Sequence, residues 1–175
     1  MPLSKGDEVP ATPPRSRLVE WQDPMISASV VSTMSGIEFL RAIRDGKLPP
    51  PPFAVLMGMR MMEVEPGTVV FECEPDESVY NPIGVVHGGL VCTLADTVSA
   101  CAVQTTLDVG FTYTSIDLNV SYLRAVTVDS GTLRATGTVT KPGRRVAFAS
   151  AEIVDGAGKV VATATTSCLV MAPAT

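Results

Sequence analysis

The sequence contains few of the side chains on which many kinds of active site depend. Its 175 residues include one histidine, His87, so a histidine triad or a histidine-rich metal site must use that residue or does not exist. The four cysteines, Cys73, Cys92, Cys101 and Cys168, form no Cys-x-x-Cys pair, which disfavours a zinc site or a redox dithiol. We interpret all four as small buried hydrophobic side chains.

Several longer patterns are absent too. No run of about 18 apolar residues occurs, and the N-terminus, MPLSKGDEVP, lacks the basic start and apolar stretch of a signal peptide. Thirteen Lys and Arg residues against eighteen Asp and Glu residues give a net charge of −5 and a pI near 4.8, which argues against nucleic acid or an anionic membrane as a partner. We therefore expect a cytoplasmic protein. The sequence has no GxSxG, Walker or GxGxxG motif either.

What the chain does contain is typical of one packed domain with an N-terminal arm. Hydrophobic residues make up 46%, charged residues 18%, and the mean hydropathy is +0.29. Nine of the fourteen prolines fall within residues 1–52. Residues 1 to about 30 are therefore predicted to be an extended arm, which Trp21 would pin to the domain.

A short helix is predicted after this arm. Ser35 is placed to cap it, with Glu38 at the capping-box position and Gly46 as the stop. The run Pro49–Pro52 then predicts an extended connection. We accordingly divide the chain into a proline-rich arm with a short helix, residues 1–51, and a main domain, residues 52–172.

The main domain shows strand patterns around one long helical segment. Residues 88 to about 107 predict a helix with apolar side chains on nearly all sides, which must be covered all round. Ile116, Leu118, Val120 and Tyr122 alternate with polar residues as one face of a strand. The predicted strands are 59–64, 68–74, about 116–122, 133–139, 146–154 and 159–171. Most are joined by short turns, which favours an α+β fold in which an antiparallel sheet curls around the helix.

Two features of the helical segment point to chemistry. His87-Gly88-Gly89 stands at its start, where backbone N–H groups without helical acceptors can stabilise a developing oxyanion; a plain tight turn is the alternative. Asp96 is the helix's only charge and has no Lys or Arg three or four residues away, so it is a functional candidate unless it reaches solvent or caps a loop. Eight residues, about 12 Å of helix, separate Gly88 from Asp96. If they act together, a two-fold dimer must bring them together.

The pattern resembles a known enzyme family. Asn81, His87-Gly88-Gly89, Asp96 in Leu-Ala-Asp-Thr, and the strand Tyr113–Arg124 are similar to the hotdog-fold acyl-CoA thioesterases of the phenylacetyl-CoA thioesterase type. The resemblance covers roughly residues 52–170. It implies a hotdog fold for residues 52–172, a curled antiparallel sheet wrapped around a long central helix, and an extra N-terminal helix before it.

The resemblance also implies roles for individual residues. Asp96 would be the nucleophile or the general base toward water, and Gly88 would polarise the thioester carbonyl through its N–H group, with Gly89 beside it at the substrate. Asn81 would help position the thioester or the water, His87 would make a supporting contact, and Ser115 would hold the attacking water. In the family the Asp and Ser come from the partner subunit.

The expected substrate, the expected partners and the alternative functions rest on this resemblance and on the local charge of the chain. We expect hydrolysis of an aryl- or medium-chain acyl-CoA to the free acid and CoA, in a homodimer that pairs into a tetramer, without metal or organic cofactor. The basic residues Arg124, Lys141, Arg144 and Arg145 are expected to contact the phosphates of CoA. Two alternatives stay open: a non-catalytic acyl-CoA-binding hotdog protein, and a hotdog dehydratase or hydratase.

Overall fold

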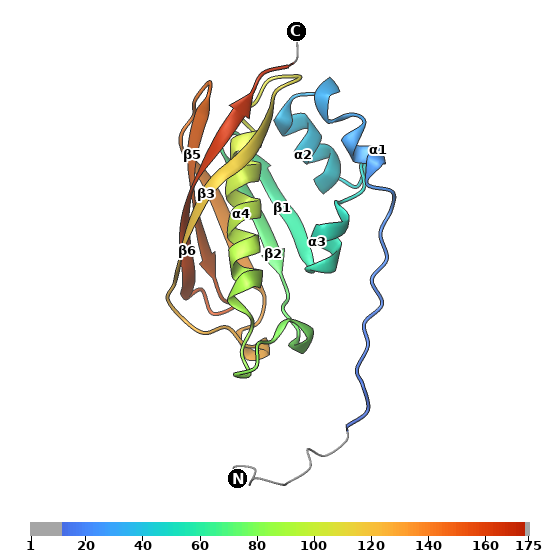
Figure 1. Ribbon diagram of the computed structural model, residues 1–175, viewed down its shortest axis with the longest axis vertical. Coiled ribbons are helices and arrows are strands. Elements are labelled where there is room, and N and C mark those ends of the chain that lie inside the picture. Colours follow the sequence, from blue (N-terminus) through green and yellow to red (C-terminus); the bar gives the residue numbers. More distant parts are fainter. Residues whose placement is uncertain (1–11, 174–175) are drawn as a thin grey trace.

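An antiparallel sheet of six strands curves around the central helix α4 (Figure 1). The computed structural model describes residues 12–173. The strands are β1 (Met59–Glu65), β2 (Thr68–Cys73), β3 (Thr112–Tyr122), β4 (Leu133–Lys141), β5 (Val146–Val154) and β6 (Val160–Met171), in the sheet order β1-β2-β4-β5-β6-β3. The helices are α1 (Met25–Ala28), α2 (Gly36–Arg44), α3 (Pro52–Leu56) and α4 (Gly88–Gln104). The predicted α+β arrangement of two strands, a long helix and four further strands is confirmed.

Helix α4 lies on the concave side of the sheet and fills the core. Its buried residues, among them Leu94, Val98 and Val103, pack against strands β2, β4 and β5. Gly137 allows the backbone of β4 to lie close to that of α4, because a Cβ atom at this position would be only 2.1 Å from the carbonyl oxygen of Val98. Within one protomer the cover of α4 is incomplete, since the side that carries Asp96 is only half-buried, so the prediction that α4 is covered all round stays a prediction. The sheet reaches around one side of the helix and leaves the other accessible.

Strand β3 is an edge strand whose regular alternation is broken. A bulge between Ser115 and Asp117 shifts the register with β6, and Ile116 falls at that bulge with 57% of its surface exposed. The prediction that Ile116 lies on one strand face with Leu118 and Val120, which are half-buried, is therefore wrong. Because of the bulge, Ser115 pairs with the buried Cys168 and faces α4.

The opposite edge of the sheet, strand β1, is covered by α2 and α3 (Figure 1). The predicted capping box is present: the Ser35 side chain accepts a hydrogen bond from the N–H of Glu38, whose carboxylate accepts one from the N–H of Ser35. Pro52 begins α3 rather than ending an extended connection, which corrects the prediction, since proline is favoured at the first position of a helix. Helices α2 and α3 lie on either side of the predicted boundary after residue 51, which stays a prediction.

The arm is held by charged side chains rather than by Trp21. Trp21 is 61% exposed, so the prediction that it pins the arm is wrong. Instead, Arg17 donates hydrogen bonds to Asp76 and to the carbonyl oxygen of Leu56, and Arg15 pairs with Glu77. The first part of the predicted arm, residues 1–11, lies outside the described residues. Among residues 12–173, no helix has both the length and the apolar surface that a membrane crossing requires.

Candidate active site

Asp96 and Ser115 come together on the open side of α4. Asp96 lies in the third turn of the helix and is half-buried, and the Ser115 hydroxyl on β3 donates a hydrogen bond of 2.8 Å to Asp96 Oδ1. The second carboxylate oxygen, Oδ2, accepts no hydrogen bond from residues 12–173. It is therefore available to a water molecule or to an electrophile, while Ser115 fixes the orientation of the carboxylate.

At the start of α4, one of the two glycine amides is free. His87 is the N-cap residue, and its Nδ1 atom accepts a hydrogen bond of 2.8 Å from the N–H of Gly89. Within residues 12–173, the N–H of Gly88 donates to no acceptor. Both glycine amides were predicted to lack a hydrogen-bond acceptor, but only the amide of Gly88 does. The positive end of the helix dipole lies at the same place. This N–H group is suited to stabilise an oxyanion.

A small hollow of about 300 Å³ opens in front of Gly88. Tyr122 and Arg124, from the end of β3 and the loop after it, contribute to its wall, and the Tyr122 hydroxyl donates a hydrogen bond of 3.0 Å to the carbonyl oxygen of Gly88. A Cβ atom on Gly88 would lie 3.3 Å from the Tyr122 ring. Strand alternation put Tyr122 on the same face of β3 as Leu118 and Val120 but did not predict this contact, which depends on how β3 curves over the start of α4.

Asn81 shapes the loop that leads into α4. Its Oδ1 atom accepts hydrogen bonds from the N–H groups of Ile83 (3.1 Å) and Val85 (3.3 Å), and Gly84 has a φ of +81°, which favours glycine. The side-chain oxygen of Asn81 thus organises the loop. The structure gives its side-chain amide no hydrogen bond within the described part of the chain.

The predicted basic residues fall into two groups. Arg124 lies at the hollow in front of Gly88. Lys141 ends β4, Arg144 and Arg145 lie in the turn between β4 and β5, and Arg144 lines a hollow with Thr106, next to the C-terminal end of α4. Gly88 begins α4 and Gln104 ends it, so this turn lies about 25 Å from Gly88 within one protomer.

Three of the cysteines, Cys73, Cys101 and Cys168, are unsuited to nucleophilic chemistry. Burial raises the pKa of the Cys101 thiol to about 12, with a further contribution from the negative charge of Asp96, and it raises the pKa of Cys73 to about 11. Burial also raises the pKa of Cys168. These thiols stay protonated at neutral pH, and a protonated thiol is a weak nucleophile. Cys73 and Cys168 are buried as predicted, whereas Cys92 and Cys101 are half-buried.

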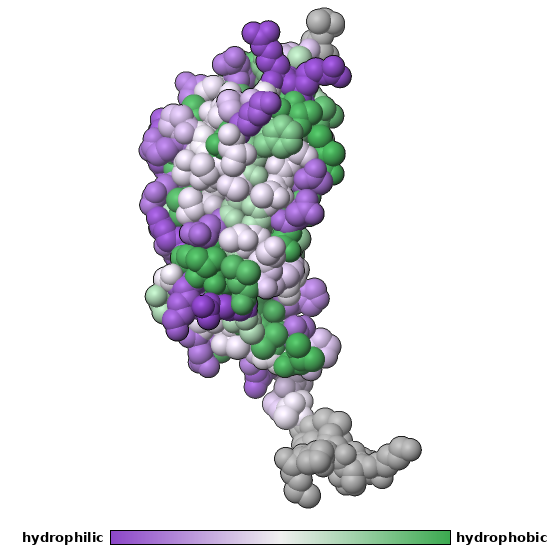
Figure 2. All heavy atoms as spheres, turned by 90° about the vertical axis from the view of Figure 1, so that its left-hand side faces the viewer, coloured by the Kyte–Doolittle hydropathy of each residue, from purple (hydrophilic) through white to green (hydrophobic). Residues whose placement is uncertain are grey.

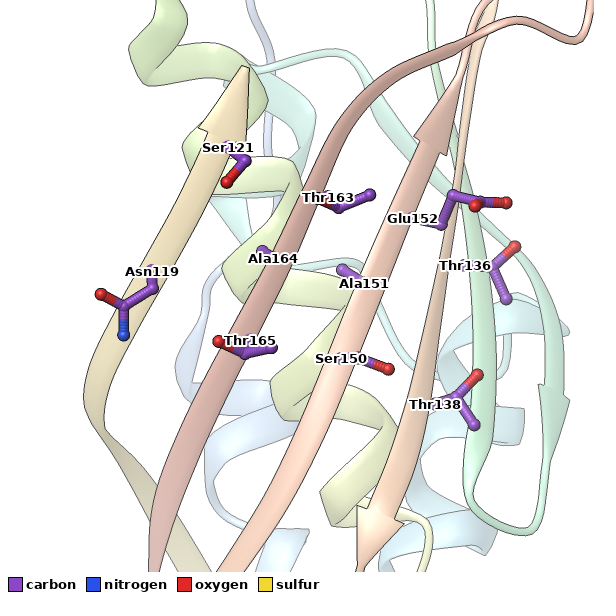
Figure 3. A pocket seen from close by; sticks show the side chains of 10 residues that line it. All are labelled: Asn119, Ser121, Thr136, Thr138, Ser150, Ala151, Glu152, Thr163, Ala164 and Thr165. Carbon is purple, nitrogen blue, oxygen red and sulfur yellow. The ribbon is translucent and has the colours of Figure 1, made fainter. Parts of the chain in front are cut away.

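The outer face of the sheet, opposite α4, carries a polar hollow of about 590 Å³ (Figure 3). Its side chains come from β3, β4, β5 and β6 and are mostly short hydroxyl groups such as Thr138, Ser150 and Thr165. Figure 2 shows this side of the molecule as a broad, weakly polar area with more hydrophilic residues mainly at its borders. Since α4 lies behind the strands in Figure 3, Asp96 and Gly88 are not part of this hollow. Among residues 12–173, no three His, Cys, Asp or Glu side chains group together as metal ligands.

Comparisons with known proteins agree with this geometry. A profile of the thioesterase superfamily matches residues 83–162, from the loop before α4 to the start of β6. Human acyl-coenzyme A thioesterase 13 is 33% identical over 109 residues, which cover 62% of this chain and 76% of the human protein. The chain belongs to the thioesterase superfamily.

Solved structures place this thioesterase among the hotdog proteins. The PaaI protein from the phenylacetic acid degradation operon of E. coli superposes with a TM-score of 0.69 at 23% identity, over 80% of this chain and 97% of that one. A Streptococcus mutans protein solved with bound acetyl CoA gives a TM-score of 0.60 at 25% identity, over 67% and 91%. The predicted hotdog fold and thioesterase family are confirmed.

Proposed function

We propose that this thioesterase hydrolyses the thioester of an aryl- or medium-chain acyl-CoA to the free acid and CoA. The observation that carries the proposal is the pair of groups on α4: a carboxylate held by Ser115 at Asp96, and a free amide at Gly88. The human relative named as an acyl-coenzyme A thioesterase and the S. mutans protein solved with acetyl CoA support acyl-CoA as the ligand class.

The reaction needs a donor for the carbonyl oxygen and a base or nucleophile for the carbonyl carbon. The Gly88 N–H donates to the carbonyl oxygen and stabilises the negative charge that develops there. Asp96 either attacks the carbonyl carbon or removes a proton from the attacking water, and Ser115 keeps its carboxylate, and the water beside it, in position. The thiolate of CoA leaves and takes up a proton that comes from the water. If Asp96 attacks directly, water then hydrolyses the mixed anhydride on Asp96 to the free acid. Asn81 and His87 act on the loop and helix start that carry Gly88, and Gly89 lines the same site.

Two protomers supply these groups. Within one protomer Asp96 lies about 12 Å along α4 from Gly88, too far for both to touch one thioester group. Strand β3 presents an edge of eleven residues that pairs only with β6 among the described residues, with Ile116 and Tyr122 exposed. A long uncovered edge favours pairing with another chain. We therefore propose a two-fold dimer through β3, in which Asp96 faces Gly88 of the partner subunit, and a tetramer formed from two such dimers.

The same dimer explains how the distant basic residues take part in binding. Two α4 helices that run antiparallel across a two-fold axis bring the C-terminal end of one toward the start of the other. We propose that Arg124 and the partner subunit's Lys141, Arg144 and Arg145 contact the phosphates of one CoA. Charge-assisted hydrogen bonds to phosphate suit these side chains.

The experiment that tests the proposed function compares wild type with Asp96→Asn. Asparagine keeps the size of the side chain but removes its basic, nucleophilic oxygen, so we expect kcat to fall at least about 100-fold with little change in KM. Release of the CoA thiol is measured with aliphatic and aryl acyl-CoAs. An unchanged rate in Asp96→Asn would refute the assigned role.

The same assay separates the two alternatives. If wild type binds acyl-CoAs but releases no thiol, the protein is an acyl-CoA-binding hotdog protein. A dehydratase or hydratase would need His87 as an acid or base, so thiol release that persists in His87→Ala counts against that alternative.

A further inference from the structure

An apolar cavity of about 490 Å³ lies between the open side of α4 and the N-terminal helices. Helix α2 contributes Phe39, Leu40 and Ile43 to its wall, α3 contributes Ala54, and β1 contributes methionines such as Met59 and Met61. Phe39 and Ala54 are buried. Methionine side chains adapt to irregular apolar ligands, and a cavity of this size fits a small-molecule group.

The cavity begins next to Asp96. Thr97, the next residue in α4, lines it, and so does Tyr113, which lies two residues before Ser115 on the same face of β3. Burial is the main cause of the raised pKa of both Tyr113 and Cys101, and the charge of Asp96 adds to it in both, which agrees with this proximity. The cavity therefore lies beside the position of an acyl group whose carbonyl carbon is at Asp96.

The length of the cavity follows from α4. Thr97, Cys101 and Gln104 all line it, so it extends along eight residues of helix, a rise of about 10 Å. An extended octanoyl chain has about this length. Arg44 and Arg60 also contribute to the lining, and the side chain of Arg60 is 63% exposed and paired with Glu74.

The outer wall of the cavity is firmly attached to the domain. The N–H of Gly36, at the start of α2, donates a hydrogen bond of 3.0 Å to the carbonyl oxygen of Leu107, just beyond α4. Arg41 donates from Nε to the carbonyl oxygen of Val64 and pairs with Glu65, which ties α2 to β1. The wall is thus a fixed part of the structure. It also precedes residues 83–162, the part that matches the superfamily profile.

We infer that the segment from α2 to α3 selects the acyl group, and that Phe39 and Ala54 set the longest chain accepted. The inference rests on the proposed function and names its substrate class: unbranched medium-chain acyl-CoAs, with octanoyl-CoA near the optimum. Phe39 lines the cavity from α2, and Ala54, a small side chain, lines it from α3. Both are specificity-determining residues, not catalytic ones.

The test measures kcat/KM of wild type and variants with butyryl-, octanoyl- and dodecanoyl-CoA. Phe39→Ala removes a wall and is expected to raise the ratio of dodecanoyl to octanoyl hydrolysis about ten-fold. Ala54→Leu fills the cavity and is expected to lower the ratio of octanoyl to butyryl hydrolysis about ten-fold. Phe53→Ala is the matched control: Phe53 lies in α3 beside Ala54, but is 54% exposed and does not line the cavity. It is expected to leave both ratios unchanged.

The outcomes separate this inference from the proposed function. Variants that hydrolyse all three substrates with rates changed by one common factor, or a Phe53→Ala control that shifts the ratios equally, would overturn it. If wild type hydrolyses no acyl-CoA, the proposed function fails. The role of the cavity is then tested by calorimetry, in which the ratios of the binding constants for the three CoA esters replace the ratios of kcat/KM. Ala54→Leu gives an independent answer if Phe39→Ala does not fold.

Discussion

At the scale of single residues, the candidate site depends on the backbone as much as on side chains. Gly88 offers an amide, and the neighbouring groups hold it in place: His87 caps the helix, Asn81 orders the loop before it, and Tyr122 bonds the Gly88 carbonyl. The sequence motif singled out Asn81, His87 and Gly88, but not the contact that Tyr122 makes with Gly88. It did not predict the hydrogen bond from Ser115 to Asp96, because Ser115 faces α4 only through the bulge beside Ile116, and a bulge leaves no clear signal in strand alternation.

The role of the Gly88 amide is tested by comparing Gly88→Pro with Gly88→Ala. Proline removes the N–H but fits the first position of a helix, and His87 has the extended backbone that precedes proline. Alanine keeps the N–H and introduces the same Cβ contact with the Tyr122 ring, which is free to move because Tyr122 is exposed. We expect Gly88→Pro to lower kcat about 100-fold or more, because one oxyanion donor is lost. Gly88→Ala keeps this donor and is expected to lower kcat much less. Equal effects of the two would mean that shape, not the donor, matters.

At the scale of secondary-structure elements, local chemistry and tertiary contacts contribute differently. The boundaries of α2 were predictable because its capping box is a local signal, and β5 was predicted from Val146 to Val154 as observed. Helix α3 was missed because the proline run that precedes it favours an extended chain, and only the packing of Ala54 stabilises so short a helix. The open side of α4 within one protomer was not predicted, because hydropathy alone does not tell a face covered by the sheet from one that lines a cavity.

The attachment of α2 to α4 gives a prediction about stability. Alanine normally stabilises a helix relative to glycine. At Gly36, however, the new Cβ atom would lie 1.8 Å from the carbonyl oxygen of Gln104, so α2 must move away from α4. We expect Gly36→Ala to lower the free energy of unfolding by about 2 kcal/mol, as overpacking does, measured by urea denaturation. A variant as stable as wild type would show that α2 is not held as described.

At the scale of the whole molecule, the two edges of the sheet differ. Edge strand β1 is bulged between Met61 and Glu63 and covered by α2 and α3, whereas edge strand β3 is long and uncovered. The edge of β3, next to the half-buried Asp96, is therefore the one that a second copy of the chain can pair with. The sequence predicted, from the helical distance between Gly88 and Asp96, that a dimer is needed if the two residues act together, but it did not point to β3 as the edge that we propose for that dimer. The order of strands in a sheet depends on long-range pairing that no local pattern records.

Subunit complementation tests most directly the claim that each site takes Asp96 from one protomer and Gly88 from the other. Asp96→Asn and Gly88→Pro chains are co-expressed with different affinity tags, the mixed dimer is purified by both tags, and CoA thiol release from octanoyl-CoA is measured. One site of the mixed dimer then holds both defects and the other holds none, so we predict about half the wild-type kcat although each parent homodimer is inactive. A mixed dimer as inactive as its parents would contradict the account, since each site would then lie within one chain.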